Sequence, residues 1–272
     1  MRRIWRTGTH CEPVVKGRCV MFNILKKNRK ADFGNTIVVV SEHDQRAQEP
    51  SAEQKIDDVV LDQKDFKIRL ADSDAGRSSA SMLINTMYSW RGYGGTHELK
   101  KSLNRITLTA SDNDKVVGTI TLGIDSPVGL LADEIFKNEI DGFRQRGRKV
   151  CELTKLAFDP ETRSKRVLAS LFHIVFIFLH RLHQCTDIFI EVNPRHRLFY
   201  EKLLGFKQLG DEKINTRVNA PAFLLAVDSA YVEEQIRQLG GTVARGSKSR
   251  SLYPYFFSAR EAEGIAGRLH NL

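Results

Sequence analysis

Residues 193–206 combine polar and charged side chains with the signals of a strand end, a helix start and a helix stop. An apolar strand is expected over residues 187–192, and Asn193 follows it directly. Asn193 suits a helix N-cap, Pro194 suits the first helical position, and Gly205 suits the left-handed residue that ends a helix. The sequence therefore predicts a site at the carboxyl end of a strand, although an ordinary strand-to-helix connection would carry the same signals.

The charge balance points to acidic partners. The chain of 272 residues has 42 Lys and Arg against 33 Asp and Glu, which gives a formal net charge of +9. This excess suits nucleic acid, an anionic membrane, a phosphorylated cofactor or an acidic carrier protein. The basic residues are scattered among acidic ones and form no stripe with interleaved aromatics. A basic nucleic-acid-binding module is therefore the weaker, non-enzyme alternative, and no nucleic acid is expected as a partner.

The cysteines and the apolar segments bear on location. The four cysteines lack the spacing of a metal site, so no metal is predicted, and two of them lie in apolar segments where a thiol behaves as a small hydrophobe. A reducing cytoplasm is the simplest inference. The N-terminal residues lack the apolar core of a signal peptide. The apolar run over residues 167–182 is shorter than the roughly 20 residues that span a bilayer, so it predicts a buried helix.

The periodicity of apolar residues predicts one α/β domain with two appendages. Residues 1–63 are expected to be a weakly ordered or flexible leader with a short strand at 36–40, residues 64–230 the domain, and residues 231–272 a C-terminal helical extension. Strands are expected over 66–71, 105–110, 115–124, 150–158, 187–192 and 222–228, and helices over 75–88, 129–146, 163–183, 195–204, 229–239 and 259–269. This order predicts an α/β (α+β) fold with a twisted, mixed central sheet and helices on both faces.

Four stretches, together with the element order, resemble the N-acyl amino acid synthases. This family is a branch of the GNAT superfamily of N-acyltransferases and is related to the acyl-homoserine-lactone synthases. The resemblance covers residues 66–228 and implies the GNAT N-acyltransferase fold. The stretches are residues 87–93 (MYSWRGY), 118–126 (GTITLGIDS), 151–157 (CELTKLA) and 194–200 (PRHRLFY).

The resemblance implies an enzyme that moves a long-chain fatty acyl group from the thioester of acyl carrier protein to the α-amine of an amino acid. The donor would be acyl-phosphopantetheine on the carrier protein or acyl-coenzyme A, and no permanently bound cofactor is expected. Two enzymatic alternatives share the scaffold: an acyl- or acetyl-coenzyme A-dependent acetyltransferase and an acyl-homoserine-lactone synthase.

The resemblance places the donor's phosphate at the turn over residues 161–169. Free N–H groups and the dipole of the following helix favour an anion there, and Arg163, Lys165 and Arg166 add positive charge. Arg163 and Ala169 fit the family's pattern, whereas Arg166 stands where glycine is usual. This departure disfavours a close clasp on the pyrophosphate of coenzyme A and suits the single phosphodiester of a carrier-bound pantetheine. A solvated basic helix start is the alternative.

The resemblance also suggests the catalytic groups. Glu152 lies among apolar neighbours where the family has a catalytic or substrate-orienting carboxylate. Burial would raise its pKa toward a value suited to deprotonating an ammonium, so Glu152 is predicted as the base in preference to His196. Lys155 replaces the Arg of the lactone synthases and offers a weaker clasp for a substrate carboxylate. Tyr200 lies where many acyltransferases of this fold have a tyrosine that protonates the leaving thiolate. Its spacing along the helix also fits an aromatic residue of the core. Arg195, like His196, faces an anion or solvent.

The acceptor side is predicted from the loop that follows the first helix. Trp90, Arg91 and Tyr93 stand in a glycine-rich turn that is able to close over the acceptor, with Arg91 paired to its carboxylate. Aromatic residues that merely pack on the sheet are the alternative. Asp125 is predicted to bind a positively charged group, or only to make a turn.

Two further segments complete the predictions. Basic residues on either side of strand 150–158 predict the docking face of an acidic carrier protein, with an attraction that weakens as salt rises. Residues 252–257 (LYPYFF) leave three roles open: a cover for the acyl tunnel, a partner contact or a peripheral membrane contact. The basic residues are Arg144, Arg146, Arg148 and Lys149 before the strand and Arg163, Lys165 and Arg166 after it.

Overall fold

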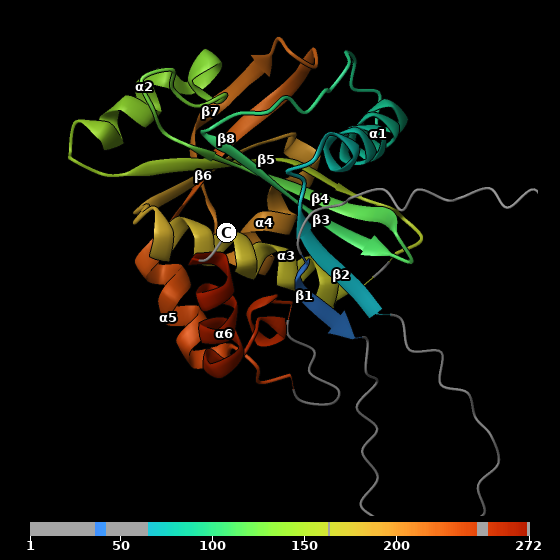
Figure 1. Cartoon of the computed structure of the whole chain (residues 1–272). Coiled ribbons are helices and arrows are strands. Elements are labelled where there is room, and N and C mark those ends of the chain that lie inside the picture. Colours follow the sequence, from blue (N-terminus) through green and yellow to red (C-terminus); the bar gives the residue numbers. More distant parts are fainter. Residues whose placement is uncertain (1–35, 42–64, 163, 244–249, 271–272) are drawn as a thin grey trace, which may run out of the picture. The chain divides into compact units, whose positions relative to one another are not determined.

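The computed structural model describes residues 36–41, 65–162, 164–243 and 250–270. Their strands form an eight-stranded sheet in the order β1-β2-β3-β4-β5-β6-β8-β7 (Figure 1). The strands are β1 Thr36–Ser41, β2 Asp65–Leu70, β3 Arg105–Asp112, β4 Lys115–Ile124, β5 Val150–Phe158, β6 Asp187–Val192, β7 Lys207–Asn215 and β8 Ala220–Asp228. The helices are α1 Asp74–Trp90, α2 Asp133–Arg144, α3 Lys165–Ile177, α4 Arg197–Leu204, α5 Ser229–Leu239 and α6 Ala259–His270, with short turns η1 Phe178–Leu182, η2 Pro194–His196 and η3 Tyr253–Tyr255.

Alternation along the central strands gives the sheet one apolar and one polar face. Successive side chains of a strand point to opposite faces. Leu108 of β3 and Ile120 of β4 are buried on one face in the main core. Thr107, Thr121 and Thr154 stand side by side across β3, β4 and β5 on the opposite face. One face of β3 and β4 thus belongs to the main core, and the other carries a row of threonines beside the smaller cores under α1 and α2.

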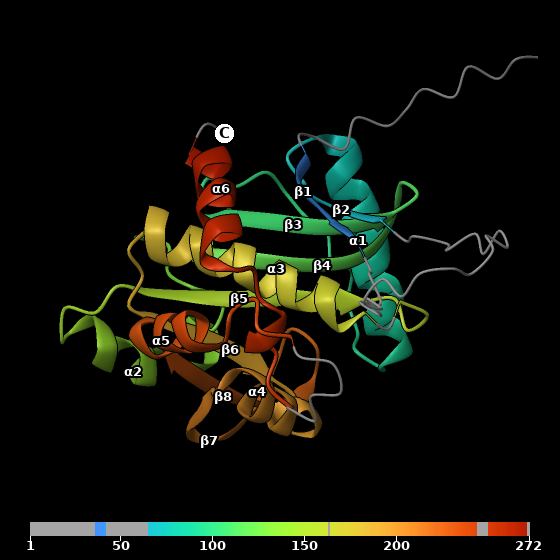
Figure 2. The same cartoon turned by 90° about the horizontal axis from the view of Figure 1, so that it is seen from below.

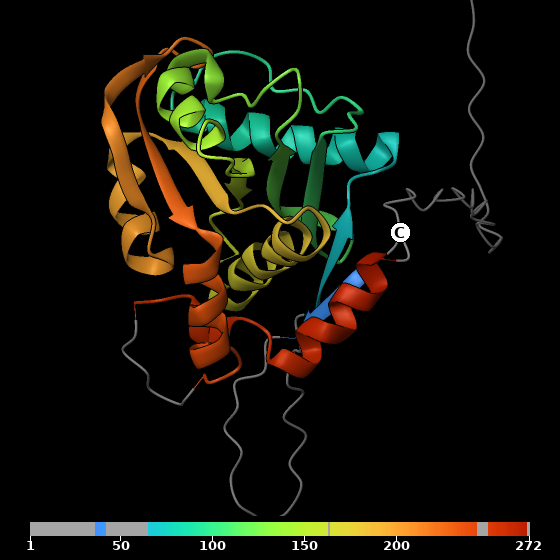
Figure 3. The ribbon, with the colours of Figure 1, turned by 90° about the vertical axis from the view of Figure 1, so that its left-hand side faces the viewer.

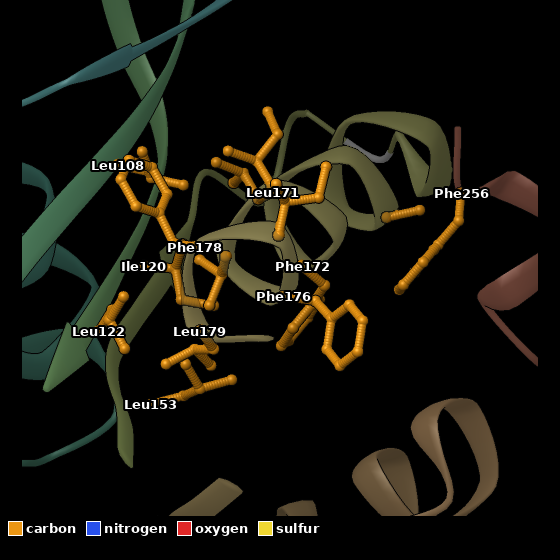
Figure 4. Close-up of a cluster of buried hydrophobic side chains, with 14 of the residues drawn as sticks. Leu108, Ile120, Leu122, Leu153, Leu171, Phe172, Phe176, Phe178, Leu179 and Phe256 are labelled. Carbon is orange, nitrogen blue, oxygen red and sulfur yellow. The ribbon is translucent and has the colours of Figure 1, made fainter. Parts of the chain in front are cut away.

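Helices cover both faces, and this confirms the predicted mixed α/β architecture. α3 lies across β3, β4 and β5 on the apolar face (Figure 2), and leucine, isoleucine and phenylalanine side chains fill the space between them (Figure 4). α1 and α2 lie together on the opposite face (Figure 3). There Ile84 of α1 packs near Ala157, and Phe136 of α2 packs near Phe189. None of the helices in the described ranges has the length and apolar character needed to cross a bilayer.

The sheet opens between β5 and β6, the one parallel pair among the described strands. The two strands are in register only from Val150 opposite Asp187 to Leu153 opposite Ile190. Beyond Leu153 a bulge shifts the register of β5 against β4, and Lys155 takes a left-handed backbone conformation with φ of 51°. A bulge bends its strand and redirects side chains. The second half of β5 thus leaves β6, which opens the sheet at its centre.

Two predicted boundaries and one missing strand need correction. The helix predicted over 129–146 begins only at Asp133, because the amides before it donate to side chains instead. Leu130 N donates to the Asp133 carboxylate, and the amides of Leu131 and Ala132 donate to the Glu152 carboxylate. The helix predicted over 163–183 continues past Ile177 as a π-helical turn. Strand β7 was not predicted, because most of its residues are exposed and polar on both sides, so no alternation marks it.

The predicted leader contributes an edge strand. β1 pairs antiparallel with β2, while residues 1–35 and 42–63 of the predicted leader lie outside the described residues. From the far end of the chain, Arg268 of α6 donates through Nε to the Ile37 carbonyl at 2.8 Å. Both ends of the described chain therefore extend the predicted domain. The division at residues 63 and 230 stays a prediction.

The segment over residues 252–257 packs inside the protein. Tyr253 is buried, and its hydroxyl donates to the Leu204 carbonyl at 2.7 Å. The Phe257 N–H donates to Nδ1 of His173 at 2.9 Å, and Phe256 stacks on the His173 ring. Burial lowers the pKa of His173 to about 3, which keeps this nitrogen an acceptor. The buried side chains of this segment therefore belong to the core beside α3 and α4.

We expect Tyr253→Phe to lower the free energy of unfolding by about 1–2 kcal/mol, because the Leu204 carbonyl loses its buried donor. Thermal melting should register this as a drop of several degrees. Tyr255→Phe removes a hydroxyl from a half-buried ring of the same turn and is the matched control. Equal melting temperatures for the two variants would show that the Tyr253 bond adds nothing.

Candidate active site

A cavity of about 710 Å³ occupies the opening between β5 and β6. Its walls include Leu153 and Leu156 from β5, Ile190 and Glu191 from β6, and residues from both faces of the sheet. A volume between about 300 and 1,000 Å³ is typical of sites for small organic ligands. The cavity thus connects the apolar face under α3 with the polar face under α1 and α2.

The start of α3 forms one end of the cavity. Ser164 caps the helix by accepting from Val167 N at 3.1 Å, and both Ser164 and Lys165 line the cavity. Of the other residues predicted to bind the donor, Arg166 is exposed and Ala169 is buried in the core. Arg163 lies outside the described residues. The helix dipole and Lys165 make this end suitable for an anion.

The two basic groups predicted to dock a carrier protein lie at opposite ends of β5. A nine-residue strand is about 30 Å long, so the groups do not share one edge of the site. Before the strand, Arg144 binds three carboxylates, and Arg148 binds Asp187 and Asp228. These ion pairs neutralise much of the first group. Arg146 and Lys149 of the first group are exposed, as are Lys165 and Arg166 of the second, and of these four only Lys165 lines the cavity.

A cross-strand row of Arg105, Gly123 and Glu152 lies on the polar face. The Glu152 carboxylate accepts from Leu131 N at 2.8 Å and from Ala132 N at 3.0 Å. Arg105 Nη2 lies 4.0 Å from Glu152 Oε1. A Cβ on Gly123 would meet Glu152 Oε1 at 2.8 Å, so the row needs glycine at its centre.

Glu152 is 2 % exposed and lines a small pocket of about 100 Å³ next to the main cavity. Burial raises the pKa of its carboxyl, against the lowering by the Leu131 and Ala132 amides. Arg105 lines both the small pocket and the main cavity. The two amide bonds tie the loop before α2 to β5 through the Glu152 carboxylate. Its role as the base stays a prediction.

Glu191 of β6 is a second buried carboxylate, and it was not among the predicted site residues. It lines the main cavity, and its side chain is 7 % exposed. Its carboxylate accepts from Arg217 Nη2 at 2.6 Å and from Asn215 Nδ2. Burial raises the pKa of Glu191, while Arg217 lowers it. Arg217 also binds Glu134 and the Leu131 carbonyl, and so joins the β7–β8 turn to α2.

Tyrosines form the wall of the cavity beside α1 and α4. Tyr88 and Tyr200 both line it, and burial raises the pKa of each hydroxyl far above its ordinary value. Tyr88 contacts the rings of Tyr93 and His97 edge to face. No described residue forms a hydrogen bond with the Tyr200 hydroxyl. Tyr200 therefore packs against the main core, as expected of a core aromatic, and also lines the cavity.

The loop after α1 lies against the helix that follows β6. Arg195 donates to the Arg91 carbonyl at 3.2 Å and stacks on Tyr93 at 5.2 Å. Arg91, Tyr93 and His196 line the cavity, whereas Trp90 is exposed and does not. Burial and the nearby guanidinium of Arg195 lower the pKa of His196. The predicted acceptor loop thus contributes Arg91 and Tyr93 to the cavity, while Trp90 faces outward.

Asp125 lies outside both pockets. Arg144 donates to it from Nε and Nη2, each at 2.8 Å, and also binds Asp133 and Asp141. The positively charged group at Asp125 is therefore a side chain of the protein, and the network fixes α2 against the end of β4.

Comparison with known proteins identifies the family. The family model described as N-acyl amino acid synthase FeeM matches residues 79–228, more than half of the chain. The chain belongs to this family. The solved structure of FeeM, an N-acyl amino acid synthase from uncultured soil microbes, is 27 % identical with a TM-score of 0.56, over 62 % of this chain and 93 % of that chain.

More distant structures are also similar to the chain. A coenzyme A-dependent acyl-homoserine lactone synthase, BjaI, is 14 % identical with a TM-score of 0.42, over 58 % of this chain and 76 % of that chain. An acyl-CoA N-acyltransferase from Pseudomonas aeruginosa is 13 % identical with a TM-score of 0.43, over 60 % of this chain and 98 % of that chain. No curated protein sequence matches the chain.

Membership of the FeeM family confirms that the protein is an N-acyltransferase with a GNAT-type fold. The parted strands, with an anion-compatible helix start at one end and charged groups at the other, suit a thioester donor and an amine acceptor. Four groups that line this cavity were missed from the sequence: Arg105, Glu191, Arg217 and Tyr88. Glu191 directly precedes the Val192–Asn193 strand exit, and its place there is the one signal that could have found it.

Proposed function

We propose that the protein transfers a long-chain fatty acyl group from the thioester of acyl carrier protein to the α-amine of an amino acid. The observation that carries this proposal is the cavity that runs through the sheet where β5 and β6 part. Its α3 side is lined by apolar residues, and its other side holds charged groups. An amphipathic donor and a charged acceptor can meet there from opposite faces of the sheet.

The parted strands suit a pantetheine arm. Beyond Leu153, β5 is not paired with β6. The backbone N–H and C=O groups of β5 that face β6 there can form hydrogen bonds with the amides of the pantetheine arm. Exposed sheet edges bind extended peptides in the same way, as an additional strand. Lys165 and the start of α3 would take the phosphodiester. Ser164 already occupies the Val167 amide, which favours one phosphate over a pyrophosphate at this turn.

The acyl chain needs an apolar wall. Leu153 and Leu156 of β5, Leu168 and Phe172 of α3, and Ile190 of β6 line the cavity on the α3 side. Burial of apolar surface stabilises a bound chain by about 0.8 kcal/mol per methylene. This wall supports a fatty acyl donor over an acetyl donor.

The reaction breaks the carbon–sulfur bond of the thioester and forms a carbon–nitrogen bond. The acceptor ammonium first loses one proton to a base, and the nitrogen loses a second proton as the amide forms, which balances the proton that the leaving thiolate gains. Glu152 was predicted as the base, and Glu191 is the carboxylate that lines the main cavity. Both lie on the polar face, where the amine would approach.

Tyr200 is proposed to serve the leaving thiolate. Burial raises the pKa of its hydroxyl, which keeps it protonated and able to donate a hydrogen bond. The same shift makes complete transfer of its proton less favourable. Stabilisation of the developing negative charge is therefore the role that its setting supports.

The test compares donors and acceptors in one experiment. The full chain is incubated with palmitoyl-acyl carrier protein, palmitoyl-coenzyme A or acetyl-coenzyme A, each with a mixture of amino acids or with S-adenosylmethionine. Mass spectrometry then identifies the products. We expect N-palmitoyl amino acids with the carrier-protein donor. A lactone product, or transfer only from acetyl-coenzyme A, would replace the proposal by one of its enzymatic alternatives.

We also propose that the reaction takes place in the cytoplasm, where acyl carrier protein would be available. The two cysteines in the described part of the chain, Cys151 and Cys185, are free thiols. Free thiols are usual in reducing compartments.

A further inference from the structure

Two tight turns at one end of the sheet each expose a large apolar side chain. Leu103, just before β3, is 94 % exposed, and its turn is closed by Ser102 Oγ, which accepts from the amide two residues further on at 3.3 Å. Val128, after β4, is 83 % exposed, and its turn is closed by a bond of 2.8 Å from Gly129 N to the Ser126 carbonyl. These are the two highest exposed fractions among the large apolar residues of the described chain.

The two turns lie side by side. Ile124 N donates to the Asn104 carbonyl at 2.8 Å, which joins the end of β4 to the loop before β3. Ser102, Asn104 and Val128 line the same small pocket. A single exposed apolar residue is normal on a protein surface, whereas neighbouring ones form a patch that favours contact with another body.

Three exposed cations lie at the same end of the sheet: Lys101, Arg146 and Lys149. Lys101 stands two residues before Leu103, and the other two lie in the connection from α2 to β5. That connection reaches the two turns, because β5 begins opposite the end of β4. The apolar tips are therefore accompanied by positive charge from two separate segments.

The acidic side chains of this end are already neutralised. Arg144 binds three carboxylates around the end of β4, and Arg148 binds Asp187 at the start of β6. Within the described part of the chain, no carboxylate forms an ion pair with any of the three exposed cations. Lys149 Nζ instead donates to the neutral side chain of Gln184 at 2.9 Å. The surface around the two turns thus keeps its positive charge.

We propose that this end of the sheet docks on an anionic lipid bilayer, with Leu103 and Val128 inserted among the lipids and Lys101, Arg146 and Lys149 at the headgroups. Apolar side chains are stabilised by leaving water, and anionic headgroups attract nearby lysines and arginines. An acidic carrier protein fits this end less well. It would have to deliver its phosphodiester to the start of α3, which lies beyond the other end of β5, about 30 Å away.

The docking end borders the polar side of the cavity. The small pocket between the turns is also lined by Glu152 and Arg105, and Arg105 lines the main cavity as well. A bilayer bound here lies beside the site from which a long-chain product is released. This use of the bilayer rests on the proposed function, whereas the docking itself does not.

The test mixes the full chain, without substrates, with vesicles of phosphatidylcholine or of an equal mixture of phosphatidylcholine and phosphatidylglycerol. Flotation measures the bound fraction. We expect binding to the anionic vesicles that weakens as salt rises. Leu103→Ser and Val128→Ser should each lower the partition coefficient by about 10-fold, and Arg146→Gln and Lys149→Gln each by about 5-fold.

Matched controls lie at the opposite end of the sheet. Ile214→Ser removes an apolar residue of β7 that is 58 % exposed, and Lys67→Gln removes an exposed lysine of β2. Both should bind vesicles as the unmodified protein does. Thermal melting shows whether each variant folds, and the four variants of the docking end lie in separate segments, so one that fails to fold leaves the others as tests.

Three results would overturn the inference. The first is no binding to anionic vesicles, or binding that the four variants and the two controls change equally. The second is a raised KM of Arg146→Gln for palmitoyl-acyl carrier protein without vesicles, which would assign this end to the carrier protein. The third is a dimer in sedimentation that Leu103→Ser dissociates, which would assign it to a second copy. Because the vesicle measurement contains no substrate, its failure is distinct from a failure of the proposed function.

Discussion

Glu191→Gln is expected to lower kcat/KM for acyl transfer to an amino acid by about 100- to 1,000-fold, the usual contribution of a general base. The carboxylate lines the cavity where β5 and β6 part, and the substitution keeps its size and one acceptor oxygen for Arg217. Its NH₂ group would face Asn215 Nδ2, so thermal melting of the variant checks that it folds. The change therefore removes the negative charge of the proposed base with little change in shape. Steady-state kinetics with palmitoyl-acyl carrier protein measures the loss.

A second acceptor separates base catalysis from positioning. Hydroxylamine is largely unprotonated at neutral pH and needs no base before it attacks the thioester. The Glu191→Gln variant should therefore transfer the acyl group to hydroxylamine at nearly the rate of the unmodified protein. Glu98→Gln is the matched control, because Glu98 is an exposed carboxylate that also lines the cavity. An equal loss with amino acid and hydroxylamine would exclude Glu191 as the base.

The pH dependence of the rate is an independent test of Glu191 as the base. Burial raises the pKa of Glu191, so the basic form is lost as the pH falls through a value above the ordinary glutamate pKa of about 4.3. The rate should fall with it on the acid side of the profile. In Glu191→Gln this limb should disappear, while the ionisation of the acceptor amine remains in both proteins. A profile unchanged by the substitution would contradict the assignment.

Local patterns of the sequence predicted the framework of the site well. The strand exit at Asn193, the helix start at Pro194 and the left-handed Gly205 are all present in the structure. The alternation in residues 105–110 places threonines on one face and leucine and isoleucine on the other. Such features depend on neighbours in the chain, which a single sequence displays.

The missed features depend on residues far apart in the chain. Glu191 looked like an ordinary strand residue, because its partner Arg217 lies on a hairpin whose first strand, β7, has no periodic signal. The helix predicted from residue 129 starts late because Glu152, more than twenty residues further on, takes the amides of Leu131 and Ala132. The bulge could not be predicted from a glycine, because its left-handed residue is Lys155. Tertiary contacts decide these positions, and they also form the polar half of the cavity.

Glu152→Gln is expected to lower both stability and transfer. One of the amides of Leu131 and Ala132 would then face the side-chain NH₂ group, which leaves a buried donor unpaired at a cost of about 1–3 kcal/mol. Arg105 would lose the carboxylate next to it, so we expect the KM for the amino acid to rise together with the loss in kcat. Thermal melting and steady-state kinetics on the same preparation measure both effects.

Gly123→Ala tests whether the position of Glu152 or its proton affinity matters. The added Cβ would lie 2.8 Å from Glu152 Oε1 and would displace the carboxylate without removing it. If Glu152 acts by positioning, Gly123→Ala should reproduce the Glu152→Gln defect, and hydroxylamine should restore neither variant. If Glu152 is the base, as the sequence predicts, hydroxylamine should restore Glu152→Gln and leave Glu191→Gln impaired. The two carboxylates thus give opposite patterns with one acceptor, and this identifies the group that deprotonates the amine.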